Sequence, residues 1–246
     1  QKKTMPPKLY DLTTLQREAN RFFGYTAQET LQELQELYED KLVTYPRTDS
    51  QYITEDMEQS TMELLEVLPE ILPFLEGNMG YDVGRIINND KVSDHHALLP
   101  TKESVKKGFS QLTEKQRNLY CMIGQRLAQA VSKECTYEET QITVQCAGHE
   151  FMAKGKRMTE PGFWKIATGF RASLKKSGEE TDTNKEELLE ENLQEGMEFS
   201  RIQAEADRHF TSPPKAFTED TLLMAMETAG NKEFDAETEK KGLGTP

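Results

Sequence analysis

The chain has 246 residues, 35% of them hydrophobic, and a formal net charge of −13. Its length suits one large domain or two ordinary ones. No run of the sequence approaches the roughly 20 apolar residues of a membrane span. The three cysteines form no C-x-x-C pair, which excludes a disulfide framework and a zinc ribbon and leads us to expect a cytoplasmic protein.

The negative net charge argues against a simple nucleic-acid coat, because affinity for the phosphate backbone comes from Lys and Arg. The charge is unevenly distributed, however. Residues 154–176 hold seven basic residues and one acid, whereas residues 177–207 hold eleven acids and two basic residues. A solvated acidic loop can dominate the total without touching a working surface, so nucleic-acid binding stays open.

The first forty residues predict two amphipathic helices. Thr13 and Gln16, and then Thr26 and Glu29, have the spacing of a capping box, and Gly24 stands where a helix C-cap belongs. The short link between the two segments predicts a helix-turn-helix hairpin. Apolar residues recur at helical spacing in both segments, namely Leu15, Ala19, Phe22 and Phe23, and then Leu31, Leu34 and Tyr38.

Residues 41–45 predict a short strand that ends in a turn, since Pro46 holds the residue before it out of the helical region. Thr54 is a candidate cap for a third helix, and residues 77–94 have the composition of loop and short strand. Thr113 opens a long predicted helix over residues 114–132.

The apolar period then changes from helical to alternating, which predicts a β-hairpin that turns at Ala147-Gly148. Residues 162–166 and 197–206 predict two further strands. The acidic, polar segment over 177–195 between them predicts a loop or a short exposed helix. After a break at two prolines, Thr218 caps a last predicted helix that ends at Gly230.

The segment Thr44–Ser50 holds the residues best suited to catalysis. A tyrosine before a rigid turn is presented at a fixed angle, and Arg47 lies on the same side as Tyr45 if the backbone stays extended. A phenol, with its ordinary pKa of about 10, needs a cation or a base nearby to act as a nucleophile. A guanidinium also grips phosphate with two parallel hydrogen bonds. From spacing alone, a surface turn with a partly buried tyrosine is the simpler interpretation.

Two adjacent histidines, His95 and His96, precede a strand-like pair of leucines. On an extended segment neighbouring side chains point to opposite faces, so at most one of these histidines faces a given site. No third ligand lies three or four residues away, and we therefore expect no metal site here.

Five segments resemble, in order, landmarks of the type IA DNA topoisomerases. Residues 7–39 resemble the run that leads into their active site, and Thr44–Ser50 resembles the segment with their catalytic tyrosine. The segment His95–Thr101 is similar to their histidine segment, in the form found in the topoisomerase III branch. Residues 213–219 and 242–246 resemble two further landmarks.

This resemblance implies a reaction. Tyr45 would attack a DNA phosphodiester and give a 5′-phosphotyrosyl bond and a free 3′-hydroxyl, after which a strand passes and the break is religated without ATP. Arg47 would hold the scissile phosphate and stabilise the charge of the transition state, and His95 would donate a hydrogen bond to the same phosphate. Three neighbours would fix the turn and the arginine: Thr48, Asp49 and Ser50.

The resemblance also predicts an α+β chain in three parts. Residues 4–133 would be a helical, winged-helix-like domain that carries the tyrosine, 134–212 a segment of a β-rich arch, and 213–246 the truncated start of the next helical domain. The arch surrounds a hole for single-stranded DNA, and basic residues would line it, unless they are ordinary surface side chains. The candidates are Lys154, Lys156 and Arg157.

In the family, the ligands of the Mg²⁺ cofactor belong to a TOPRIM domain that precedes these segments. We therefore expect the chain to be a fragment that binds no metal and does not relax DNA alone. The sequence contains no G-x-x-x-x-G-K-[ST] motif, so we expect no nucleotide as a ligand.

Two other functions have to be separated from the enzyme. One is a non-catalytic helix-turn-helix module in which Tyr45 contacts a phosphate, and the other is a structural or partner-binding domain with the tyrosine in its core. The predicted helix over 27–40 is rich in Gln and Glu, which disfavours DNA readout by that helix. The enzyme requires Tyr45, Arg47 and His95 to reach one phosphate-sized position.

Overall fold

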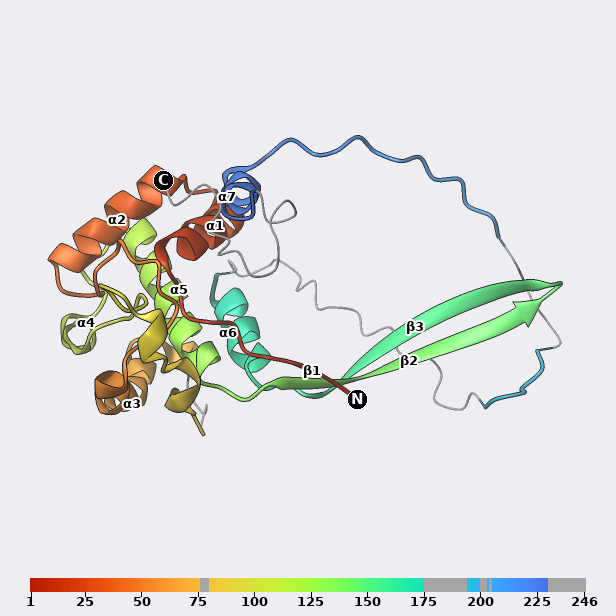
Figure 1. The fold of residues 1–246 in the computed structure, drawn as a ribbon, viewed down its shortest axis with the longest axis horizontal. Coiled ribbons are helices and arrows are strands. Elements are labelled where there is room, and N and C mark those ends of the chain that lie inside the picture. The colour runs from red at the N-terminus through yellow and green to blue at the C-terminus, as the bar shows by residue number, and fades with distance from the viewer. Residues whose placement is uncertain (76–79, 175–193, 200–202, 204, 230–246) are drawn as a thin grey trace.

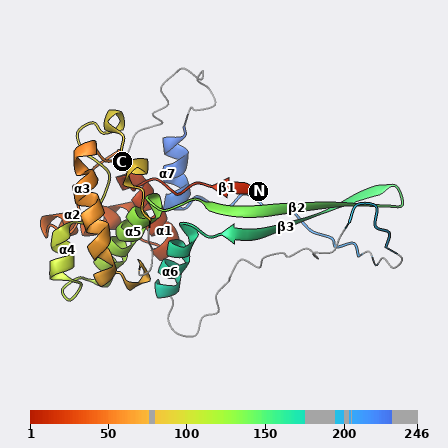
Figure 2. The same ribbon diagram turned by 90° about the horizontal axis from the view of Figure 1, so that it is seen from below.

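The computed structural model describes residues 1–75, 80–174, 194–199, 203 and 205–229. This part of the chain combines helices with one small antiparallel sheet, as the predicted α+β class requires. The helices gather in one body, from which a long β-hairpin projects (Figures 1 and 2). None of the described helices is long and apolar enough to cross a membrane.

The elements follow one another in the order β1, α1 to α5, β2, β3, α6 and α7. The strands are β1 Lys2–Thr4, β2 Cys135–Cys146 and β3 His149–Glu160. The helices are α1 Leu12–Phe23, α2 Ala27–Glu39, α3 Glu58–Val67, α4 Lys102–Lys107, α5 Glu114–Ala130, α6 Trp164–Leu174 and α7 Glu219–Glu227. Short 3₁₀ turns, among them Val83–Ile86 and Asn89–Lys91, occupy the described part of the stretch predicted as loop and short strand.

Side-chain caps set the ends of the first two helices. Thr26 opens α2 with a complete capping box, and Gly24 ends α1 in the left-handed region at φ 70°, which confirms both predictions. The predicted start of α1 is wrong. Asp11 is the N-cap in place of Thr13, because its carboxylate accepts a hydrogen bond from the Thr14 backbone N–H at 2.7 Å.

The later helix starts are mostly as predicted. Thr113 opens α5 with a capping box, and Thr218 caps α7. Thr54 precedes a 3₁₀ turn instead of an α-helix, and its side chain makes no cap hydrogen bond. The last helix ends at Glu227, three residues before the predicted end at Gly230, which itself lies outside the described residues. The predicted strand over 41–45 is reduced to a single bridge, at Val43.

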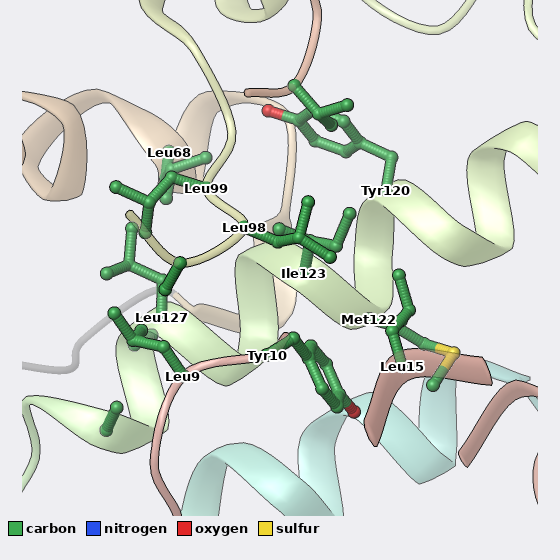
Figure 3. Packing of buried hydrophobic residues seen from close by; sticks show 14 of the residues in the cluster. Leu9, Tyr10, Leu15, Leu68, Leu98, Leu99, Tyr120, Met122, Ile123 and Leu127 are labelled. Carbon is green, nitrogen blue, oxygen red and sulfur yellow. The ribbon is translucent and has the colours of Figure 1, made fainter. Parts of the chain in front are cut away.

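The core is built around α5, whose apolar side chains are almost completely buried (Figure 3). Each fully buried Leu, Ile or Met side chain contributes about 1.5–3 kcal/mol to folding stability relative to an exposed one. Tyr10 and Leu98 pack in the same core and form an antiparallel bridge. The segment before α1 and the segment after the two histidines are therefore joined inside the body.

The predicted hairpin is confirmed. Strands β2 and β3 pair from Thr136 and Glu160 at the base to Cys146 and His149 at the tip, with one irregularity between Thr136 and Tyr137. Ala147 and Gly148 form the two-residue turn, both at positive φ. Twelve-residue strands extend roughly 40 Å. Strand β1 pairs only with the base of the hairpin, where Lys2–Thr4 lies opposite Cys135–Tyr137.

Two predicted strands are wrong. Residues 162–166 enter α6, where Ile166 and Phe170 are buried at helical spacing. The apolar run at 162–166 is too short to show a helical period. Within 197–206, the described residues 197–199, 203, 205 and 206 are not in a strand. Met197 and Phe199 are exposed, and apolar alternation gives a strand only where a neighbouring strand pairs with it.

Candidate active site

Tyr45 lies directly after a point where two segments of chain are bonded side by side. The Thr44 N–H donates to the Leu99 carbonyl at 3.0 Å, and the Leu99 N–H donates to Thr44 Oγ1 at 3.0 Å. The Thr44 hydroxyl also donates to the Ala97 carbonyl at 3.3 Å. These bonds fix the residue before Tyr45 against the segment that carries the histidines.

The structure brings Tyr45 and His95 together. Their ring centroids are 4.3 Å apart, with an angle of 42° between the ring planes. Tyr38, at the end of α2, contacts the same tyrosine edge-to-face at 5.4 Å. Tyr45 is half-buried and His95 is exposed, so solvent reaches the site. His96 differs, because its Nδ1 lies 2.8 Å from the Ala97 carbonyl oxygen.

Arg47 is exposed on the same turn, directly after the buried Pro46. No hydrogen bond or ring contact between described residues joins Arg47 to Tyr45 or His95. Its guanidinium is likewise unpaired with any described carboxylate. Arg47 therefore lies on the turn that carries Tyr45, and its exposed side chain is available to a ligand.

Thr48 and Ser50 hold the turn from inside, at 5% and 4% exposure. The Thr48 hydroxyl donates to the His95 carbonyl at 3.1 Å and accepts a hydrogen bond from the Ser50 N–H at 3.1 Å. The Ser50 hydroxyl donates to the Lys91 carbonyl at 2.8 Å. The turn that carries Tyr45 is thus bonded to both ends of the segment 91–95.

Asp49 is exposed, and within the described residues it forms no ion pair with Arg47. Its charge acts on Asp11 instead. Burial is the largest cause that raises the pKa of Asp11 above its ordinary value, and the negative charge of Asp49 is a smaller one. The hydrogen bonds that Asp11 accepts act in the opposite direction.

The start of α1 supports the turn. The Leu12 N–H donates to the Thr48 carbonyl at 3.0 Å, and the Gln51 side-chain amide donates to Asp11 Oδ2 at 2.8 Å. The same amide of Gln51 donates to the Thr14 hydroxyl at 3.1 Å. Sequence reasoning missed Gln51, since nothing in its spacing points to a partner forty residues earlier.

A buried polar cluster joins Tyr10 and Glu18 to Arg126 of α5, and sequence reasoning did not predict it. The Tyr10 hydroxyl donates to Glu18 Oε2 at 2.5 Å and accepts a hydrogen bond from Arg126 Nη2 at 2.9 Å. Arg126 forms an ion pair with Glu18 and lies over the Tyr10 ring at 4.1 Å. Burial raises the pKa of Tyr10 far above its ordinary value, although the Arg126 charge opposes this. The Tyr10 carbonyl accepts a hydrogen bond from the Leu98 N–H at 2.8 Å, which connects the cluster to the histidine segment.

The described residues contain no group of three or more His, Cys, Asp or Glu side chains that could hold a metal ion. The resemblance places the ligands of the Mg²⁺ cofactor outside these segments, and the described side chains around Tyr45 offer no set of three such ligands.

The basic residues predicted to bind DNA lie on β3, in the hairpin that projects from the helical body (Figure 1). Arg157 lies 3.5 Å from Glu138 of the neighbouring strand, and the Lys156 ammonium is 3.8 Å from the centre of the Tyr137 ring. Lys154 is exposed opposite a glutamine. The hairpin itself therefore partly neutralises or covers two of the three charges.

Comparison with known proteins gives one family. The sequence profile described as "DNA topoisomerase" matches residues 1–246. The chain is 37% identical to DNA topoisomerase 3 of Bacillus subtilis strain 168 over 254 residues, which cover 98% of the chain and 33% of that protein. It is 35% identical to DNA topoisomerase 3 of Staphylococcus aureus over 237 residues, with 94% and 31% covered.

A solved structure has a similar fold. The full-length topoisomerase I from Thermotoga maritima superposes with a TM-score of 0.60 at 23% identity, and the match covers 92% of this chain and 35% of that one. The chain thus spans about a third of the length of the curated relatives.

Proposed function

The chain belongs to the DNA topoisomerase family, in its type IA division, and from this premise we propose that Tyr45 is the nucleophile that cuts one DNA strand. The hydroxyl oxygen of Tyr45 attacks a phosphorus atom of the backbone. A tyrosyl O–P bond forms and the bond from phosphorus to the 3′-oxygen breaks, which leaves a 5′-phosphotyrosyl bond. The phenol loses one proton, and the departing 3′-oxygen gains one.

The reverse reaction restores the strand. One phosphodiester is exchanged for another in each direction, so no ATP is consumed. Between the two steps a second strand passes through the break. On this basis we propose that the full-length enzyme changes the topology of DNA and that the segment it cuts is single-stranded.

Two neighbours of the tyrosine support the phosphate. His95 has its ring 4.3 Å from the Tyr45 ring, so an imidazole N–H can donate to an oxygen of the phosphate under attack. Arg47 is exposed and unpaired among the described residues, and its guanidinium can hold the phosphate and stabilise the growing negative charge. Thr48 and Ser50 position these groups through the backbone.

The contact between Tyr45 and His95 carries the proposal. The two residues are far apart in sequence, so only the tertiary fold brings them together. The hydroxyl of Thr48 bonds the turn of one to the backbone of the other. A half-buried core tyrosine with no function would need neither an exposed imidazole nor an exposed arginine beside it.

The domain organisation is part of the proposal. We assign residues 4–133 to a winged-helix-like domain, supported by the hairpin of α1 and α2, and residues 134–212 to a β-rich arch, supported by the projecting hairpin. Residues 213–246 would begin the next helical domain. Since the chain spans about a third of its relatives, we expect it not to relax supercoiled DNA alone, and we place the Mg²⁺ requirement in the rest of the enzyme.

The test uses a chimaera in which this chain replaces the matching third of the Bacillus subtilis relative. With a labelled single-stranded oligonucleotide, the chimaera should form a covalent protein–DNA adduct that survives denaturation. Tyr45→Phe removes one oxygen atom and should abolish the adduct. The affinity for the oligonucleotide should stay within about twofold, because the ring contacts with His95 and Tyr38 are kept.

Tyr38→Phe is the matched control, since it removes a hydroxyl from the neighbouring ring and should leave the adduct in place. An adduct that persists in Tyr45→Phe would assign the nucleophile to another residue. Failure of the unsubstituted chimaera to form any adduct, although it is folded and binds DNA, would contradict the proposed reaction.

A further inference from the structure

A second aromatic ring near the site has two ammonium groups close to it. Lys8 Nζ lies 5.4 Å from the centre of the Tyr52 ring, and Lys91 Nζ lies 5.1 Å from the same point. The two charges therefore cannot be further apart than the sum of these distances. Both lysines are exposed and Tyr52 is half-buried, so a ligand in solution can reach all three.

This cluster is built on the same backbone frame as the active site. The Ser50 hydroxyl donates to the Lys91 carbonyl at 2.8 Å and accepts a hydrogen bond from the Tyr52 N–H at 3.2 Å. The Tyr52 carbonyl accepts a hydrogen bond from the Ala97 N–H at 2.9 Å, two residues after His95. Lys8 comes from the segment that leads to Tyr10 in the core. The cluster is thus held beside the turn of Tyr45.

Neither charge of the cluster has an ion-pair partner among the described residues. Elsewhere on the body three lysines each have a glutamate partner, namely Lys102, Lys106 and Lys115. Two unpaired ammonium groups around one ring repel each other, and an anion placed between them relieves that repulsion. In a protein with a net charge of −13, these two lysines place a local positive charge around one ring.

We propose that Lys8, Tyr52 and Lys91 form a binding site for the backbone phosphates of the DNA strand, next to the phosphate that Tyr45 attacks. This site rests on the proposed function for its ligand. The Tyr52 ring keeps the two lysines near each other, and the ammonium groups contact phosphate without reading the base sequence. The site holds the strand in place while the Tyr45 bond forms and breaks.

The test measures binding alone, in the 246-residue chain with Tyr45→Phe, so it does not depend on covalent chemistry. A fluorescent, unstructured single-stranded oligonucleotide is titrated at several salt concentrations between about 50 and 200 mM, a range over which binding through phosphates weakens steeply (about 10³-fold or more for six phosphates). Lys8→Ala/Lys91→Ala should weaken binding about tenfold at the lowest salt. The slope of log K against log salt should become shallower by roughly 0.7 for each phosphate that is no longer neutralised.

Lys133→Ala/Lys165→Ala is the matched control, because it removes two exposed lysines at the base of β2 and in α6, on the hairpin side of the body (Figure 1). It should change neither the affinity nor the slope. Lys8→Arg/Lys91→Arg keeps both charges and should restore the salt slope. Equal slopes in the Lys8/Lys91 variant and the parent, equal reductions in affinity in the test and control variants, or no binding by the parent would each overturn the site.

This outcome is separable from that of the proposed function. If Tyr45 is not the nucleophile but the slope changes as stated, the phosphate site stands and the chemistry falls. If the chimaera forms its adduct through Tyr45 but the slope is unchanged, the reaction stands and this site falls.

Discussion

Thr48 fixes the separation between the tyrosine turn and the histidine segment. Its side chain is 5% exposed, and its hydroxyl is both a donor to the His95 carbonyl and an acceptor from the Ser50 N–H. Its own carbonyl accepts a hydrogen bond from the Leu12 N–H. One small residue therefore connects the turn, the histidine segment and the start of α1.

Thr48→Val keeps the shape of this side chain and removes both of its hydrogen bonds. It leaves the buried Ser50 N–H without a partner, so the free energy of unfolding should fall by about 1–3 kcal/mol in urea titrations of the chain. Adduct formation by the chimaera should fall further than oligonucleotide affinity. Thr48→Ser keeps the hydroxyl and should stay near the parent in both measurements. Equal stability of the valine variant and the parent would contradict the role given to Thr48.

Sequence reasoning found the site residues whose own chemistry is telling. It missed those that act through partners distant in the sequence. Tyr45, Arg47 and His95 stood out because their side-chain chemistry and a family resemblance singled them out. Their neighbours Gln51 and Lys91 act through partners that the chain brings in from a distance. No pattern in one sequence announces such pairings, since they depend on how the helices pack.

At the scale of elements, local rules predicted the starts of α2 and α5 correctly and failed at the first helix, where Asp11 and not Thr13 is the N-cap. The capping boxes at Thr26 and Thr113 were predicted because donor and acceptor lie within one turn of the chain. Helix α6 was missed because its buried face, Ile166 and Phe170, is recognised only when the whole segment is read at helical period. Its start depends on Gly162, at φ 49°, where a Cβ would lie 2.2 Å from the Glu134 carbonyl oxygen.

The turn of the long hairpin contains a residue that is poorly suited to its conformation. Ala147 has φ 50°, in the left-handed region that Asn and Gly tolerate better. Asn-Gly is a preferred pair for such two-residue turns. Ala147→Asn should therefore stabilise the tip of the hairpin by about 0.5–1 kcal/mol, seen as slower hydrogen exchange of amides in β2 and β3.

Gly148→Ala is the opposite substitution, at φ 80° in the same turn. It should speed exchange at the tip and leave exchange in α5 unchanged. If both variants changed exchange in the same direction, the turn conformation described here would be wrong.

At the scale of the whole molecule, surface carboxylates make stability depend on pH. The hydrogen bond from Lys3, and then smaller contributions that include Arg85, lower the pKa of Glu134 to about 2. A hydrogen bond from Lys115, and then the capping box, lower the pKa of Glu29 to about 2. Each of these pKa values is lower in the folded state than in the unfolded chain. Their contribution is therefore complete above the ordinary glutamate pKa of about 4.5 and is lost as the pH falls towards 2.

Glu134→Gln tests this sign, because Glu134 joins β1 to the base of β2 through Lys3. The melting temperature of the variant should be lower than that of the parent at about pH 6, and the two should converge as the pH approaches about 2. Glu195→Gln, at an exposed position, should follow the parent curve. A constant difference between Glu134→Gln and the parent at every pH would show that the ion pair is not the cause.

The most direct test of the central claim is to identify which residue carries the DNA, and through which phosphate it is attached. In the chimaera, the adduct with a labelled oligonucleotide is trapped, digested with protease and nuclease, and sequenced by mass spectrometry. We expect a single phosphonucleotide, attached through its 5′-phosphate to Tyr45. Attachment to any other residue, or through a 3′-phosphate, would contradict the assignment of Tyr45 as the nucleophile.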